Sequence, residues 1–172
     1  MNTTFKTVVV FFLLLIASVG QAETLCRISE KVIFNCSLHN GKKLVSVCSS
    51  EKLTKDDGYL QYRFGTILKT ELVYPSTTKG TQAQFFWRYM RGSEGSGGDL
   101  SFKNHAYLYT VGRADAYEKA NGVSGGASGG VTISKIVGAH SQHYLKCDGM
   151  PEGDFYILEG IVKDETELIN SR

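Results

Sequence analysis

The sequence predicts an all-β fold: a single antiparallel β-barrel or β-sandwich of about 8–10 short strands, held together by disulfides. Three observations predict it. Short runs in which apolar and polar residues alternate recur from residue 32 to residue 162, with turn residues between them. Aromatic and β-branched residues dominate these runs, as a pleated, half-buried surface prefers. Four cysteines follow an N-terminal segment typical of export, which places them where thiols oxidise.

The first 22 residues have the pattern of a secretory signal peptide. Lys6 precedes a nearly continuous apolar run from Thr7 to Val19, and the small residues Gly20 and Ala22 stand where a signal peptidase cleaves. The run is about 13 residues long, whereas a membrane-spanning helix needs roughly 20. We therefore expect a signal peptide over residues 1–22 and a single β domain over residues 23–172. This chain would be periplasmic or secreted, without membrane insertion after cleavage.

The charge of the mature chain argues against polyanionic partners. Residues 1–22 contain one lysine and no acidic residue, which leaves 18 basic and 17 acidic side chains and a net charge of +1. A chain so close to neutral has no electrostatic attraction for nucleic acid or for an acidic membrane surface. The cysteines form no C-x-x-C pair and the histidines have no zinc-finger spacing, so we expect neither a metal nor a cofactor.

The strongest local pattern is a hairpin over residues 32–48. Two alternating runs flank Asn40-Gly41, a dipeptide that favours a tight hairpin turn because both residues tolerate positive φ. This turn would place Cys36 opposite Val45 and Ile33 opposite Cys48. Successive side chains of a strand point to opposite faces, so Cys36 and Cys48 would lie on different faces of the hairpin.

Four cysteines allow three disulfide pairings, and the predicted hairpin disfavours any pairing that joins Cys36 to Cys48. The remaining choices are Cys26–Cys36 with Cys48–Cys147, and Cys26–Cys48 with Cys36–Cys147. We expect the first choice, because Cys26 and Cys36 are close in sequence.

Further strands are expected at residues 59–64, 70–74, 84–91, 100–102, 107–111, 131–137, 143–147 and 155–162. Only residues 114–120 have a helical pattern, and that segment is short. Aromatic side chains on the strands would fill the core or, alternatively, line a ligand cavity. These candidate residues are Tyr59, Tyr62, Phe64, Trp87 and Tyr89.

Two glycine-rich segments interrupt the strand pattern. Residues 92–98 and 121–130 hold nine of the 19 glycines, and we expect them to be flexible connectors between strands. The alternative is a pair of mobile loops that close on a partner. The candidate binding residues in or beside these segments are Arg91, Ser96, Gly97, Ser128, Gly129 and Lys135.

Catalytic patterns in the chain are weak, and the sequence predicts no enzyme. Gly-x-Ser-x-Gly occurs at residues 122–126 and 126–130, but a β-branched stretch follows instead of the helix that a serine hydrolase requires. The even cysteine count leaves no free thiol if all cysteines pair. We therefore assign no catalytic residue.

Residues 36–75 resemble a group of small exported bacterial proteins without an assigned function. The likeness is carried by residues 40–42, 45–48, 62–65 and 71–75, and residues 100–102 and 107–109 extend it. A second resemblance is to the periplasmic lysozyme inhibitors, compact β domains that insert a Ser-Gly-x-x-Tyr loop into the enzyme. Ser96-Gly97, Ser124-Gly125 and Ser128-Gly129 match the start of that loop, but the tyrosine is missing from all three.

Together, these observations predict an exported, soluble binding protein of the bacterial envelope that catalyses nothing. The expected partner is an envelope or secreted protein, and inhibition of a lytic enzyme is the specific role that the second resemblance implies. The alternative is a barrel that carries a small apolar ligand in an aromatic-lined cavity.

Overall fold

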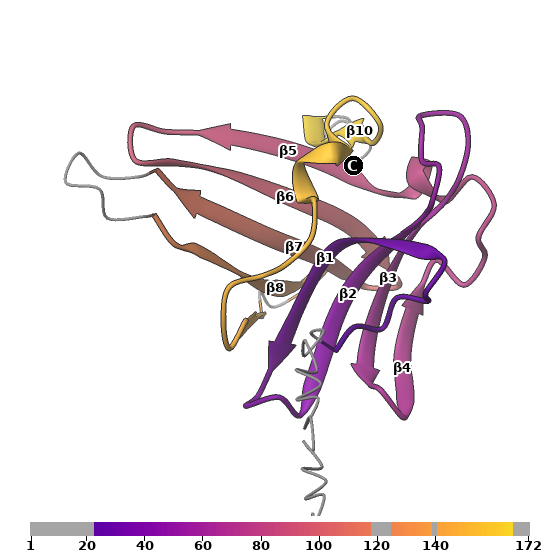
Figure 1. Ribbon diagram of the computed structural model, residues 1–172, viewed down its shortest axis with the longest axis horizontal. Coiled ribbons are helices and arrows are strands. Elements are labelled where there is room, and N and C mark those ends of the chain that lie inside the picture. The colour runs from indigo at the N-terminus through magenta and orange to yellow at the C-terminus, as the bar shows by residue number, and fades with distance from the viewer. Residues whose placement is uncertain (1–22, 118–124, 139–140, 167–172) are drawn as a thin grey trace, which may run out of the picture.

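The computed structural model describes residues 23–117, 125–138 and 141–166, and these residues form an all-β structure of two sheets (Figure 1). The sheets are separate and stack as in a sandwich, and within the described residues they do not close into a barrel. The prediction of an all-β fold is therefore confirmed. The predicted signal peptide, residues 1–22, lies outside the described residues.

The smaller sheet is antiparallel and has four strands in the order β1-β2-β3-β4. Its strands are β1 (Glu30–Leu38), β2 (Lys43–Ser50), β3 (Leu60–Thr66) and β4 (Lys69–Tyr74). The predicted first hairpin is present, with positive φ at Asn40 and Gly41 and with Cys36 opposite Val45. A bulge in β1 then places Val32 opposite Cys48, where we expected Ile33.

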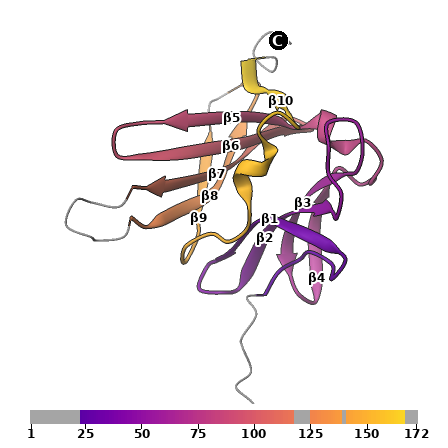
Figure 2. The same ribbon diagram turned by 45° about the horizontal axis from the view of Figure 1, so that its top comes forward.

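The larger sheet has six strands in the order β10-β5-β6-β7-β8-β9. They are β5 (Phe86–Arg91), β6 (Gly95–Asn104), β7 (Tyr107–Ala116), β8 (Ala127–Lys135), β9 (Gln142–Lys146) and β10 (Lys163–Asp164). β10 pairs in parallel with β5, and the other neighbours are antiparallel. The hairpins β5–β6 and β7–β8 project well beyond the smaller sheet (Figures 1 and 2).

Two 3₁₀ turns complete the described structure: η1 (Thr81–Gln84) before β5 and η2 (Phe155–Leu158) after β9. The expected strand at residues 155–162 is therefore wrong. Phe155 and Leu158 are fully buried, and a single 3₁₀ turn brings both onto the core, whereas an extended strand would have sent them to opposite faces. The expected helix at residues 114–120 is also not found where the structure describes it, because Ala114 to Ala116 belong to β7.

The space between the sheets is filled by packed aromatic rings. Phe102 stacks on Tyr74 and on Tyr109, with ring centroids 4.4 and 5.0 Å apart, and it also contacts Tyr62 and Phe85. Such ring contacts stabilise a core by about 0.5–1.5 kcal/mol per pair beyond the area that they bury. Tyr62 therefore fills the core, as we predicted, and does not line a ligand cavity.

Parts of the glycine-rich segments are strands: residues 95–98 belong to β6 and residues 127–130 to β8, and the expected flexible connectors at these positions are wrong. Residues 92–94 do connect β5 to β6. Gly98 lies in β6, and a Cβ built on it would lie 2.2 Å from the ring of Trp87 on the neighbouring strand. Gly129 lies in β8 under the edge of Phe34, where a Cβ would be 3.3 Å from the ring. The glycines thus let large rings lie directly against the sheet, because a side chain at these positions would occupy the same space.

The disulfides join Cys26 to Cys48 and Cys36 to Cys147, with Cα–Cα distances of 5.4 and 5.6 Å. The expected separation of Cys36 from Cys48 is confirmed, but the expected pairing of Cys26 with Cys36 is wrong. Cys36 points into the core, where Cys147 arrives from the other sheet. Cys48 points to the outer face, across which the segment containing Cys26 runs, so the face of the strand decides the pairing and the distance along the chain does not.

Candidate functional site

The two sheets differ in what covers their outer faces. On the smaller sheet, the segment Glu23–Arg27, here called the N-terminal strap, crosses the outer face and hydrogen-bonds to it. The Leu25 amide donates to Ser46 Oγ (3.0 Å), and Asn35 Nδ2 donates to the Glu23 carbonyl (3.0 Å). The strap therefore uses the polar groups of this face for the fold.

The strap also covers a buried ion pair between Arg63 and Glu30. The guanidinium donates two hydrogen bonds of 2.6 Å to the two carboxylate oxygens, and a third of 2.8 Å to the Leu25 carbonyl. The exposed fractions of the two side chains are 6% and 0%. Burial alone would raise the pKa of Glu30, but hydrogen bonds from Arg63, the Arg27 amide and Tyr59 outweigh it, so the pKa is lowered.

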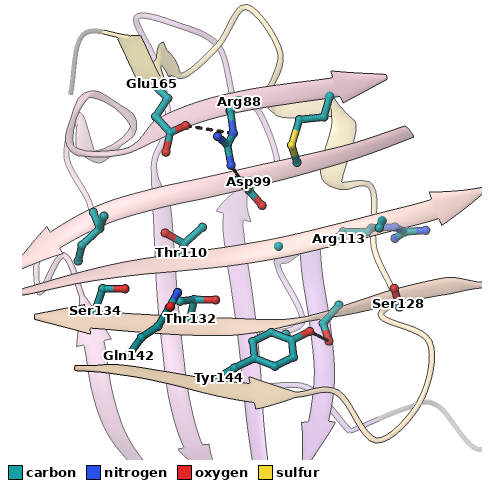
Figure 3. Close-up of a pocket in the computed structure, with 16 residues that line it drawn as sticks. Arg88, Asp99, Thr110, Arg113, Ser128, Thr132, Ser134, Gln142, Tyr144 and Glu165 are labelled. Atoms are coloured by element: carbon teal, nitrogen blue, oxygen red, sulfur yellow. Dashed lines mark hydrogen bonds and ion pairs between the residues drawn. The ribbon is translucent and has the colours of Figure 1, made fainter. Parts of the chain in front are cut away.

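No described residue crosses the central part of the outer face of the larger sheet in this way, and we call this surface the open face. Side chains of β5 to β9 line a groove of about 470 Å³ on it. Figure 3 looks onto this groove, with the smaller sheet behind. Its principal polar lining residues are Arg88, Asp99, Thr110, Ser128, Thr132, Ser134, Gln142, Tyr144 and Glu165.

A second arginine–carboxylate cluster lies at one end of the groove. Arg88 on β5 forms an ion pair with Asp99 on β6 and another, 3.1 Å long, with Glu165 beyond β10 (Figure 3). The hydrogen bond to Asp99, aided by the charge of Glu165, raises the pKa of Arg88 above its usual value. The Arg88 side chain is 51% exposed, so this cluster remains accessible from solvent.

A row of hydroxyl groups crosses the groove next to this cluster. Ser101, Thr110, Thr132 and Tyr144 are register partners on β6, β7, β8 and β9. Ser101 Oγ and Thr110 Oγ1 are 3.0 Å apart and hydrogen-bonded, and Ser101 also donates to Glu165 (3.3 Å). Thr132 forms no side-chain hydrogen bond within the described residues, so its hydroxyl remains available.

Tyr144 forms the other end of the groove, and a glycine positions it. The ring lies over Gly130, whose added Cβ would be 2.8 Å from ring atom Cε2, and the phenol donates to the Gly129 carbonyl (3.2 Å). Tyr144 remains 59% exposed. The groove thus has a charged end and an aromatic end, with hydroxyl groups between them.

The structure separates the binding residues that the sequence predicted. Gly97 and Ser128 lie on the open face, each opposite Ala114 of the strand between them. By strand alternation, Ser96 and Gly129 point to the other face of the same sheet. Both pairs belong to strands, not to the loops in which we expected them.

The two predicted basic residues lie outside the groove. Arg91 ends β5 on the face opposite to Arg88, and interactions with Tyr117 and Tyr89 raise its pKa. Lys135 ends β8, eight residues from the glycine-rich end of that strand. Neither Arg91 nor Lys135 lines the groove, and the two residues lie on different strands. The structure therefore does not bring them together in one site.

Sequence reasoning missed the residues that form the groove. Arg88, Thr132 and Tyr144 fall within expected strands, but the sequence singled out neither these three residues nor Asp99 as binding residues. The available signal was alternation: on one side β8 carries only serine, threonine and glycine from residue 128 to residue 134, and β7 carries small or polar residues on one side except at Leu108. This pattern indicates a sheet face that no second layer covers.

Among the described residues, one cluster brings metal-ligating residue types close together, and it does not support metal binding. Cys26, Cys48 and Glu30 lie close together, but both sulfur atoms are in a disulfide and the carboxylate is bound to Arg63. A metal needs thiolates and a free carboxylate, and neither is present in this cluster.

Comparison of the chain with models of known families, with curated proteins and with solved structures finds no match. Among the described residues, no helix is both long enough and apolar enough to cross a membrane.

Proposed function

We propose that this protein is an exported binding protein of the bacterial envelope that recognises its partner with the open face of the larger sheet. The observation that carries the proposal is the contrast between the two outer faces. On the smaller sheet, Ser46 and Arg63 form hydrogen bonds with the strap. On the larger sheet, Arg88, Thr132 and Tyr144 face a groove. A concave surface with a few convergent polar groups is the usual form of a binding site.

Export is supported by the pattern of residues 1–22 and by the disulfides. Two disulfides, Cys26–Cys48 and Cys36–Cys147, join all four cysteines, as expected for an oxidising compartment. A periplasmic or secreted location follows from this proposal.

Binding without catalysis fits the chemistry of the groove. Its two carboxylates, Asp99 and Glu165, both form ion pairs with the guanidinium of Arg88. A general acid or base must lie within hydrogen-bond reach of the proton that it moves, and both carboxylates are instead directed at Arg88. We therefore assign these side chains to recognition.

Inhibition of a lytic enzyme through an inserted glycine-rich loop has less support. Ser96-Gly97 and Ser128-Gly129 are strand residues with ladder partners, so their backbone is committed to the sheet. A partner protein would have to meet the open face itself. The carrier hypothesis also gains little, because aromatic residues such as Tyr62 and Phe102 pack against each other between the sheets.

Two matched variants test the proposal. Thr132→Arg places a long, charged side chain in the middle of the open face, and Thr70→Arg makes the same change on the exposed strand β4 of the other sheet. The full chain, exported so that its disulfides form, is immobilised and incubated with an envelope extract. We expect Thr132→Arg to lose the bound component and Thr70→Arg to keep it. Equal retention by both variants would contradict the proposal.

A further inference from the structure

We infer that the ligand of the open face is a neutral glycan chain. The inference rests on the proposed function, and it adds the chemical class of the ligand. Three properties of the groove lead to it: its charge, its unpaired hydroxyl and amide groups, and its fixed aromatic ring.

The charge of the residues that line the groove disfavours a polyanion. Arg88 is the cation at the charged end, and it already pairs with Asp99 and Glu165, so this end carries one more negative than positive charge. The other arginine beside the groove, Arg113, pairs with Asp115 and donates to the Gly153 carbonyl. Among the described residues that line the groove, no cation is left unpaired, so a phosphate, sulfate or uronate chain would meet carboxylates there. Lys103 and Lys146 lie on the same face by strand alternation, but outside the lining.

The middle of the groove offers hydrogen-bonding groups that both donate and accept. Thr132, Ser134 and Gln142 line it, and none of their side chains forms a hydrogen bond within the residues that the structure describes. Ser134 and Gln142 are register partners, and neighbouring strands lie about 4.7–4.9 Å apart. A ligand with hydroxyl groups repeated along its length can satisfy such a row, because a sugar hydroxyl also donates and accepts.

The aromatic end supplies an apolar surface for a sugar ring. Tyr144 is 59% exposed, and its contacts with Gly130 and the Gly129 carbonyl hold the ring in one orientation. A ring that is already fixed loses little conformational entropy when a ligand packs on it. The C–H faces of a sugar ring are apolar and can pack on tyrosine, while its hydroxyl groups reach the neighbouring polar side chains.

A protein surface fits this groove less well. A stable protein interface buries roughly 800 Å² on each partner and depends on large apolar or aromatic anchors. Within the groove, Met90 and Tyr144 are the exposed large apolar residues among those described. The most exposed apolar side chains lie elsewhere, such as Ile28 beside the strap and Leu68 at the tip of the β3–β4 hairpin. An extended peptide that adds a strand would also need a sheet edge, and the groove lies on a face.

Isothermal titration calorimetry tests the inference with three probes: oligosaccharides of N-acetylglucosamine, oligosaccharides of glucose, and heparin as a polyanion. We expect the full chain to bind at least one neutral oligosaccharide and not heparin. Tyr144→Ala and Thr132→Arg should each weaken that binding by about tenfold or more, a change of about 1.4 kcal/mol. Thr70→Arg is the matched control and should bind as the unmodified chain does.

Three results would overturn the inference: binding of heparin alone, neutral-sugar binding that survives both open-face variants, or no binding of either neutral oligosaccharide. In the last case, the retention of the envelope component separates the two proposals. If Thr132→Arg still abolishes retention, the open face binds a ligand of another class, such as a protein. If it does not, the proposed function fails as well.

Discussion

Each sheet carries an arginine paired with carboxylate on its outer face, and the two clusters differ mainly in what lies above them. Arg63 and Glu30 lie under the N-terminal strap with exposed fractions of 6% and 0%. Arg88 pairs with Asp99 and Glu165 on a face with no strap, and it is 51% exposed. The same pair of chemical groups therefore stabilises the fold on one sheet and remains available to a ligand on the other.

Under the proposed function, the smaller sheet contributes its polar outer face to stability and the larger sheet contributes its outer face to recognition. Buried charges must be fully hydrogen-bonded, and Arg63 meets this condition with Glu30, Gln61 and the Leu25 carbonyl. An exposed pair contributes little to stability, so Arg88 and its partners can bind a ligand with little cost to the fold. Five predictions test this division, beginning with the largest expected effect.

Removing the arginine from each cluster should have very different effects on stability. Arg63→Met leaves the carboxylate of Glu30 buried without its partner and should lower the free energy of unfolding by about 3–5 kcal/mol. Arg88→Met, the matched variant on the open face, should lower it by less than about 1 kcal/mol. Urea denaturation of both variants measures the two effects. Similar losses would remove the distinction between the two faces.

Opening the disulfide of the strap should destabilise the covered face. Cys26–Cys48 closes a sequence separation of 22 residues. Loop-closure entropy assigns such a disulfide about 3.4 kcal/mol, so the double variant Cys26→Ser with Cys48→Ser should lose about that amount. The strap should then become accessible, and limited proteolysis near Leu25 would detect it. Continued resistance to proteolysis would show that hydrogen bonds alone hold the strap.

Filling the glycine under Tyr144 should disturb the open face. A Cβ at Gly130 would lie 2.4 Å from the Leu145 carbonyl, so Gly130→Ala should destabilise by about 1–3 kcal/mol and shift the tyrosine ring. Gly126 has no atom within 4 Å of its added Cβ, and Gly126→Ala is the matched control. Thermal unfolding and tyrosine fluorescence measure both effects. If Gly130→Ala changes neither the stability nor the fluorescence, the position of the Tyr144 ring does not depend on this glycine.

Lowering the pH should reduce the free energy of unfolding through Glu30, by less than the substitutions above. The pKa of Glu30 is lower in the folded chain than its unfolded value of about 4.3, so its contribution is complete above about pH 4.3. That contribution is lost as the pH falls through the folded pKa, because the native state must then take up the proton. Glu30→Gln should be less stable at neutral pH and should lose less stability between pH 7 and pH 3. Urea denaturation measures the free energy of unfolding at each pH. If the pH dependence is the same for Glu30→Gln and for the unmodified chain, Glu30 does not have this role.

Alternating patterns made most of the fold predictable, including the β1–β2 hairpin and the separation of Cys36 from Cys48. The pairing of Cys26 was not predictable, because residues 23–27 form no element whose face a pattern can assign. The glycine-rich strands were mistaken for loops since composition does not show that Trp87 lies on Gly98. The open face was missed because its cluster joins Arg88, Asp99 and Glu165, the last of which is distant in sequence.

Hydroxyl-radical footprinting tests the division between the two outer faces most directly. The full chain is labelled free and with its captured envelope component bound, and oxidation is measured for each side chain. We predict that Tyr144 and Met90 on the open face become protected, while Leu68 and Ile28 on the other sheet and beside its strap remain as reactive as before. Protection of Leu68 or Ile28 with Tyr144 and Met90 unchanged would contradict the account.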